Sequence, residues 1–217
     1  MQIEILGVPV SVDGRGRVLE KVGSYLREAR FHRIATVNPE FLVLACQNNL
    51  FRENLRAADL RIADGFGMVL AGLLQGEEVP RFPGVDLLYD ILSLAEKDGY
   101  PVFLAIRKDG LSSYEEIRQA LLKKYPHLSI SGLDMTIGDL KNYQLPATTY
   151  RLILCNFGAP DQELFLEGLR NTQGDIRLAM GVGGSFDYLT GKQKRAPKCL
   201  RAIGLEWLWR LILQPWR

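Results

Sequence analysis

Residues 32–48, HRIATVNPEFLVLACQN, join an apolar run to a helix-forming one. The run from His32 to Val37 ends in four apolar or β-branched residues, which predicts a buried strand. Pro39 suits the first turn of a helix, and we expect that helix to reach about Asn48. The stretch therefore predicts a strand, a polar turn at Asn38 and a helix in direct succession.

This order of strand, turn and helix recurs along the chain. Apolar runs predict further strands at 60–63, 102–106, 128–133, 150–156 and 176–182, and helices are predicted at 17–29, 66–74, 84–97, 112–125 and from 159 onward. Ser112 and Glu115 have the spacing of a capping box. Alternating strands and helices indicate right-handed βαβ units. We therefore expect an α/β, Rossmann-like fold, which is a mostly parallel sheet with helices on both faces, opened by a small strand pair at 3–6 and 8–10.

The composition is that of an ordinary globular protein, with 47% apolar and 24% charged residues over 217 positions. A net charge of +2 excludes a general nucleic-acid-binding protein. The charge is uneven, because positions 190–217 hold seven Lys or Arg and one acid, Glu206, a net +6 that leaves −4 on the other 189 residues. We expect a domain at 1–195 and, after a hinge at Arg195-Ala-Pro197, a basic helical C-terminal appendage at 196–217 that meets an anionic partner.

The appendage is also apolar. All three tryptophans, Trp207, Trp209 and Trp216, fall in the last eleven positions. Such a segment either closes the core, or lies in a subunit interface of a homo-oligomer, or docks on a membrane surface, where Trp and basic side chains are favoured. The chain has no apolar run of 18 residues and its N-terminus lacks the pattern of a signal peptide. We therefore expect a protein with no membrane-spanning segment.

Polar or glycine-rich loops follow four of the predicted strands. In open α/β sheets, ligands bind beyond the carboxyl ends of the strands, so these loops are expected to form one site. They are Thr36-Val-Asn-Pro-Glu40, Ala63-Asp-Gly-Phe-Gly67, Asn156-Phe-Gly-Ala-Pro-Asp-Gln-Glu163 and Gly181-Val-Gly-Gly-Ser-Phe-Asp187.

Side chains in these loops have a structural and a chemical interpretation. Asp64 either caps the helix that follows or acts as a general base that deprotonates a hydroxyl group. Thr36 and Asn38 either cap the next helix or bind substrate, and Gln162 is either a solvated residue of a first helical turn or a ligand of the substrate.

The turn with Gly183 and Gly184 is either a tight turn or a cradle whose backbone N–H groups bind a phosphate or diphosphate. Lys194 and Arg195 follow closely, and cations beside such a cradle favour the phosphate interpretation. The loop is not a GxGxxG dinucleotide fingerprint.

Two further observations narrow the chemistry. Arg81 precedes a helix start and either holds a phosphate or pairs with Asp86. No DxD pair, Walker A or GxSxG motif is present, and the only histidines are His32 and His127. We therefore expect no metal site and no cofactor, and chemistry that uses a carboxylate base. Three scattered cysteines predict free thiols of a reducing compartment.

Several blocks together resemble the WecG/TagA/CpsF family, glycosyltransferase family 26. The resemblance extends in order over nearly the whole chain. Its blocks are Thr36–Glu40, Ile62–Gly67, Arg81–Asp86, Gly158–Glu163, Met180–Asp187, Gly191–Pro197 and Gly204–Arg210.

The resemblance implies an inverting, metal-independent transferase. It would move an N-acetylmannosamine-type or related sugar from a UDP donor to an undecaprenyl-diphosphate-linked sugar, in the synthesis of teichoic acid, exopolysaccharide or another cell-surface polymer. Asp64 would be the base, with Thr36, Asn38, Arg81 and Gln162 around the substrates. The resemblance also implies a cytoplasmic protein that is peripheral at the inner face of the cell membrane. The appendage would contact that membrane and complete the site with arginines, for which the matching positions are Arg210 and Arg217.

Two departures from the family's pattern carry expectations of their own. Family members have a glycine-rich turn where this chain has Ala105-Ile-Arg-Lys-Asp-Gly110, so Arg107 and Lys108 would replace backbone donors with charge. We also expect the C-terminal appendage to be shorter than that of other family members. A non-catalytic subunit that binds a sugar nucleotide or a polyprenyl phosphate is the alternative function.

Overall fold

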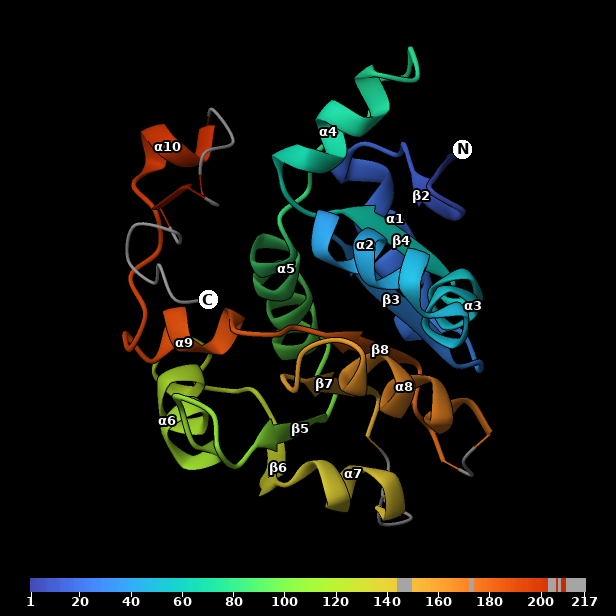
Figure 1. The fold of residues 1–217 in the computed structure, drawn as a ribbon. Coiled ribbons are helices and arrows are strands. Elements are labelled where there is room, and N and C mark those ends of the chain that lie inside the picture. Colours follow the sequence, from blue (N-terminus) through green and yellow to red (C-terminus); the bar gives the residue numbers. More distant parts are fainter. Residues whose placement is uncertain (144–149, 172–173, 203–205, 207, 210–217) are drawn as a thin grey trace.

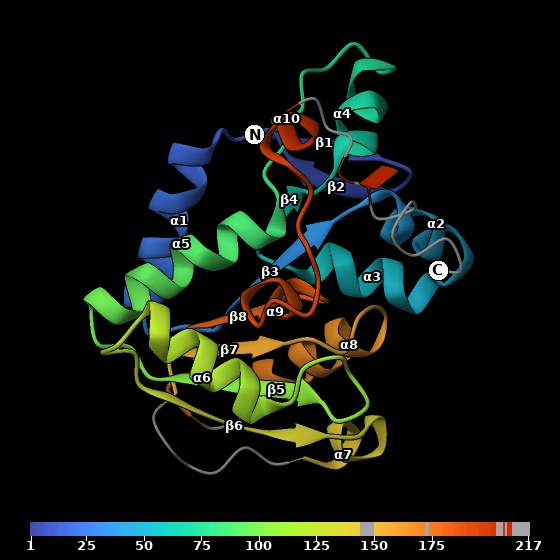
Figure 2. The same ribbon diagram turned by 90° about the vertical axis from the view of Figure 1, so that its left-hand side faces the viewer.

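A six-stranded sheet forms the centre of the structure (Figure 1), a computed structural model that describes residues 1–143, 150–171, 174–202, 206, 208 and 209. Every strand pair in this sheet is parallel, and the strand arrows in Figure 2 point the same way. The expectation of a mostly parallel sheet is confirmed. The order across the sheet is β4 (Leu60–Ala63), β3 (His32–Val37), β8 (Leu178–Gly181), β7 (Leu152–Cys155), β5 (Val102–Arg107) and β6 (Ile130–Met135).

Helices cover both faces of the sheet because successive side chains of each buried strand point to opposite sides. Ile34 packs into one apolar cluster while its neighbour Ala35 packs into another. The first face is covered by α1 (Arg15–Arg27), α5 (Gly84–Lys97), α6 (Tyr114–Lys124) and α9 (Ser185–Leu189). The second is covered by α2 (Pro39–Gln47), α3 (Asn49–Ala57), α7 (Ile137–Asn142) and α8 (Asp161–Gly168).

The remaining elements lie outside these layers. An antiparallel pair, β1 (Gln2–Ile5) and β2 (Val8–Ser11), opens the chain as expected. Helix α4 (Phe66–Leu73) follows β4, a 3₁₀ turn (Leu169–Asn171) follows α8, and α10 (Lys198–Ala202) follows α9. Arg195, in the segment between α9 and α10, pairs with Asp86 in the first turn of α5 at 2.7 Å.

Most predicted elements agree with the structure within two residues, but the capping box at the start of α6 is formed by a different pair. The capping box is formed by Ser113, whose hydroxyl accepts from the Glu116 N–H while the Glu116 carboxylate accepts from the Ser113 N–H at 2.8 Å. The predicted pair, Ser112 with Glu115, is wrong. The Ser112 hydroxyl donates to the buried Asp187 carboxylate at 2.7 Å instead, because that carboxylate needs a buried donor.

Asp13 fixes the N-terminal strand pair to α1. Its carboxylate is 4% exposed and accepts from Lys21 Nζ at 2.6 Å and from the Ser11 hydroxyl at 2.9 Å. The hydrogen bond from Lys21 has the largest effect and lowers the pKa of Asp13 to about 2.

We therefore expect Asp13→Asn to lower the free energy of unfolding by about 2 kcal/mol at pH 7. The folded-state pKa lies below the unfolded value, so this contribution is complete above about pH 4 and is lost as the pH falls towards 2. Urea unfolding of both proteins between pH 7 and pH 3 should show the difference narrowing. A control at an exposed ion pair of the same strand pair, Glu4→Gln, should change stability by less than about 0.5 kcal/mol. A difference in stability that is constant over this pH range would contradict the role of Asp13.

Candidate active site

The candidate side chains lie at the carboxyl edge of the parallel sheet. β4, β3, β8 and β7 are consecutive neighbours, so the loops that follow them emerge side by side. The Asp64 loop and the glycine turn are two strand spacings apart, about 10 Å. The four loops that the sequence selected are therefore brought to one edge.

Thr36 and Asp64 converge on the first turn of α5. A Cβ atom placed on Gly84 would lie 3.0 Å from Thr36 Cγ2 and 3.4 Å from Asp64 Oδ2. Thr36 is buried and Asp64 is half-buried. Glycine at position 84 thus lets a helix start approach the side chains of Thr36 and Asp64 at the ends of β3 and β4.

Asn38 and Gly65 hold the helices on either side of this pair. The Asn38 side chain accepts from the Phe41 N–H at 2.9 Å, so Asn38 is the N-cap of α2. The N-cap of α4 is Gly65, with a φ of 95° that favours glycine, rather than Asp64. Asn38 is therefore a helix cap, which was one of its two interpretations. Asp64 lies one residue before the N-cap of α4 and does not occupy the capping position.

Gln162 joins the β7 loop to the glycine turn after β8. Its side-chain oxygen accepts from the N–H groups of Gly158, at 3.0 Å, and Gly183, at 3.2 Å. A Cβ on Gly181 would come within 2.3 Å of the Gln162 amide nitrogen, so only glycine permits this approach. Gln162 is 2% exposed. Gln162 therefore acts as a buried link that holds the β7 loop and the glycine turn together.

The glycine turn uses one of its backbone donors internally. The Gly183 N–H is donated to Gln162, and the exposed Gly184 begins the short helix α9. In the loop after β5, two backbone donors are also used within the protein. The Arg107 N–H donates to Asn156 Oδ1 at 2.7 Å, and the Lys108 N–H donates to the Met135 carbonyl. The side chains of Arg107 and Lys108 are exposed at this edge.

Arg81 and Arg195 meet the C-terminal segment. The backbone of Arg81 lies beside Ala63 at the end of β4. Its side chain pairs with Glu206 at 3.2 Å, and the predicted pairing with Asp86 belongs instead to Arg195, at 2.7 Å. Arg195 also pairs with Glu206, at 3.3 Å. The loop before α5 and the C-terminal segment are thereby joined through one carboxylate.

Of the remaining predicted residues, Lys194 is exposed, and its carbonyl accepts from the Trp209 indole N–H at 3.2 Å. Arg210 and Arg217 lie outside the described residues.

The sequence of the chain matches a known family. A sequence model described as the Glycosyl transferase WecG/TagA/CpsF family matches residues 3–217. The chain belongs to this family. It is a glycosyltransferase of cell-surface polysaccharide synthesis.

A buried ion pair supports the site of this glycosyltransferase from the second face of the sheet. Gln162 donates to Glu163 at 3.1 Å, and the other oxygen of Glu163 accepts from Arg33 at 2.7 Å. Both Arg33 and Glu163 have side chains that are 0% exposed. Burial raises the pKa of Glu163 and the charge of Arg33 opposes that rise.

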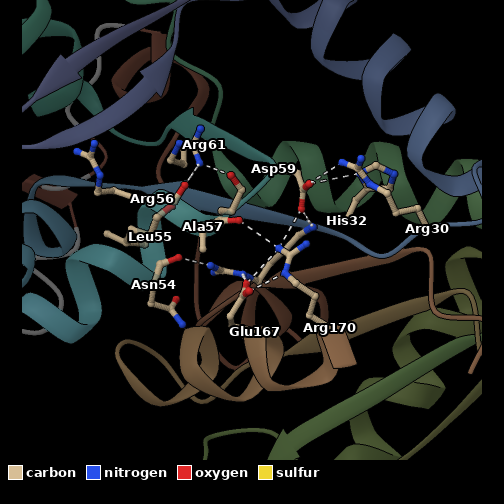
Figure 3. A network of polar contacts seen from close by, with 12 residues as sticks. Arg30, His32, Asn54, Leu55, Arg56, Ala57, Asp59, Arg61, Glu167 and Arg170 are labelled. Carbon is tan, nitrogen blue, oxygen red and sulfur yellow. Dashed lines mark hydrogen bonds and ion pairs between the residues drawn. The ribbon is translucent and has the colours of Figure 1, made fainter. Parts of the chain in front are cut away.

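The ion pair continues into a network on α3 and α8 (Figure 3). Arg33 also donates to Glu167 at 2.8 Å and to the Asn54 carbonyl, and Arg170 connects Glu167 to Asp59. Figure 3 shows Asp59 between Arg170 and the pair His32 and Arg30. Through this network, the β7 loop of the site is connected to strand β3 and to helices α3 and α8.

Two cavities lie beside α8 and the 3₁₀ turn that follows it. One, of about 320 Å³, lies between α7 and α8 and is lined mostly by apolar side chains. The other, of about 270 Å³, is lined by residues of 29–31, 169–170 and 174–177. Over the described ranges, no helix has the length and hydrophobicity needed to cross a bilayer, and no group of three or more His, Cys, Asp or Glu side chains could hold a metal ion. Cys46, Cys155 and Cys199 are free thiols, as predicted.

Gly84, Glu163 and Glu206 belong to the site but were not predicted from the sequence. Gly84 and Glu163 lie in the quoted blocks, and glycine at a helix start was an available signal for close approach. Glu206 was visible as the single acid in a basic segment.

Proposed function

We propose that this chain transfers an N-acetylmannosamine-type or related sugar from UDP to an undecaprenyl-diphosphate-linked sugar, with inversion and without a metal ion. The observation that carries the proposal is the convergence of Asp64 and Thr36 on Gly84 at the carboxyl edge of the sheet. A half-buried carboxylate at that edge can accept a proton from an acceptor hydroxyl group.

The reaction is a single displacement. The acceptor oxygen attacks the anomeric carbon of the donor sugar as Asp64 takes the hydroxyl proton, and the bond between that carbon and the UDP oxygen breaks. Attack opposite the leaving group inverts the configuration. Thr36 contacts the reacting groups through its hydroxyl, while Arg81 and Arg195 offset the negative charge of diphosphate groups. Asn38 and Gln162 hold the loops in place.

The membrane is the proposed location of the acceptor. The segment 190–217 carries a net charge of +6 and all three tryptophans, a combination that favours an anionic lipid surface. The chain would therefore work at the inner face of the cell membrane without crossing it.

Release of UDP in the presence and absence of acceptor tests this function. The full chain is mixed with UDP-N-acetylmannosamine and a short-chain polyprenyl-diphosphate-linked sugar in detergent. We expect UDP release to rise at least about tenfold with acceptor, to be unaffected by EDTA, and to yield a product of inverted anomeric configuration.

Binding of UDP without acceptor-dependent release would favour the alternative, a non-catalytic subunit that binds a sugar nucleotide. A product of retained configuration would contradict the role of Asp64 as a base.

A further inference from the structure

The cavity of about 270 Å³ lies at the amino edge of the sheet, opposite the candidate active site. Its lining includes residues 29–31, which lead into β3, and residues 174–177, which lead into β8. These strands are parallel neighbours, with His32 paired to Leu178, so the two segments lie side by side. Strand β3 is six residues long, and a strand of that length separates the two edges by about 20 Å. The cavity is therefore distinct from the site described above.

Arginine side chains dominate the charge of this cavity. Arg30, Arg170 and Arg177 line it, and Asp175 is the one acid among the described residues of the lining. Three positive charges against one negative charge leave a net +2. A cavity with this excess of cationic hydrogen-bond donors favours an anionic ligand.

Asp59, which is not part of the lining, holds two of these arginines in place. One of its oxygens accepts from Arg30 at 3.1 Å and the other from Arg170 at 3.1 Å (Figure 3). The Arg170 guanidinium also lies over the ring of Phe31, 5.0 Å from the ring centroid. Arg30 uses only Nη2 for its bond to Asp59, so most of its five N–H donors stay available. Both groups are thus oriented before a ligand binds, which lowers the entropy cost of binding.

Arg177 contributes a donor that no described residue uses. Its Nη1 donates to the Glu28 carbonyl at 2.6 Å and its Nη2 donates to Asp175. Its Nε is buried and has no hydrogen-bond partner among the described residues. Buried polar groups of native proteins are nearly always hydrogen-bonded. An unused donor on a side chain that lines a cationic cavity therefore indicates an acceptor group supplied by a ligand.

The donors and the size of the cavity define the class of this ligand. A carboxylate has two acceptor oxygens, whereas a phosphate group has three or four and matches guanidinium groups in shape and charge. The volume of about 270 Å³ is below the range of about 300 to 1,000 Å³ of most small-molecule sites, which favours a phosphate with at most a small organic group. We propose that Arg30, Arg170 and Arg177 bind the phosphate group of a small anion at the amino edge of the sheet.

Titration of the full chain with inorganic phosphate, followed by calorimetry, tests the site. Arg177→Gln should bind phosphate at least about tenfold more weakly than the wild type, because a buried charge-assisted donor is lost. Arg30→Met should bind about threefold more weakly, since its side chain is 69% exposed and its charge is screened by water. The matched control is Arg107→Met, which removes an exposed arginine at the carboxyl edge and should bind phosphate as the wild type does.

The variants locate the bound phosphate. Thermal unfolding within a few degrees of the wild type establishes that a variant is folded, and the exposed Arg30→Met decides the question if Arg177→Gln does not fold. Wild-type affinity in either folded variant would overturn the proposal. Weaker binding by Arg107→Met alone would place the phosphate at the carboxyl edge and would overturn it as well.

Titration with glucose 1-phosphate distinguishes two sources of the phosphate group. Tighter binding than that of inorganic phosphate identifies a phosphate monoester as the ligand, and weaker binding identifies the free anion. Failure of both to bind with a Kd below about 10 mM would refute the site. None of these measurements needs sugar transfer, so the proposed function and this site can fail independently of each other.

Discussion

Asp64→Asn is expected to lower kcat at least about a hundredfold, the usual effect of removing a general base. The amide has nearly the shape of the carboxylate but cannot take the proton of the attacking hydroxyl group. Because the proton moves in the transition state, kcat and kcat/KM should fall together while KM changes little. A hundredfold loss corresponds to about 2.7 kcal/mol of transition-state stabilisation.

Initial rates of UDP release at saturating donor and acceptor measure this loss. The matched control is Glu40→Gln, which neutralises an exposed carboxylate in the first turn of α2 at the same edge of the sheet. We expect this control to retain near wild-type turnover. Turnover of Asp64→Asn within about threefold of the wild type would assign the base to another group.

Arg33→Met is expected to lower the free energy of unfolding by about 3 to 5 kcal/mol. The substitution leaves Glu163 fully buried without its charged partner, and it removes bonds to Glu167 and to the Asn54 carbonyl. Removal of one member of a buried pair costs far more than removal of an exposed one. Arg30→Met removes an exposed member of the same network, with a side chain 69% exposed, and should cost less than about 1 kcal/mol.

The pH dependence identifies Glu163 as the cause. Its pKa is already raised by burial and should rise further when Arg33 is absent. A carboxyl group with a raised folded-state pKa binds protons more tightly when folded, so stability increases as the pH falls towards the unfolded value near 4. The deficit of Arg33→Met measured by urea unfolding should therefore be smaller at pH 5 than at pH 8. Equal deficits at both pH values would mean that an uncompensated Glu163 charge is not the origin of the loss.

The sheet and the location of the site could be predicted from the sequence because both depend on local patterns. Apolar runs and helix-start residues indicate strands and helices within a few positions, and the carboxyl ends of parallel strands meet at one edge. Asp64 and Thr36 follow from this rule. Helix α3 was not predicted, although Asn48 is a suitable cap and Phe51 and Leu55 are apolar positions at helical spacing.

Partners that are distant in sequence could not be predicted in this way. Arg33 and Glu163 are separated by 130 positions, and Arg81 and Glu206 by 125. Several acids would have suited each arginine, and only the packing of the elements selects one. The same holds for Gln162, which was interpreted either as a solvated residue of a first helical turn or as a ligand of the substrate. Its side chain is buried and joins two loops, through bonds that the sequence pattern does not indicate.

The structure of the protein with UDP and a non-transferable acceptor analogue tests the central claim most directly. The reacting hydroxyl group of the analogue should lie about 2.6 to 3.2 Å from a carboxylate oxygen of Asp64, with the UDP diphosphate on the far side of the anomeric carbon. An acceptor hydroxyl group held at another edge of the sheet, out of reach of Asp64, would contradict the account.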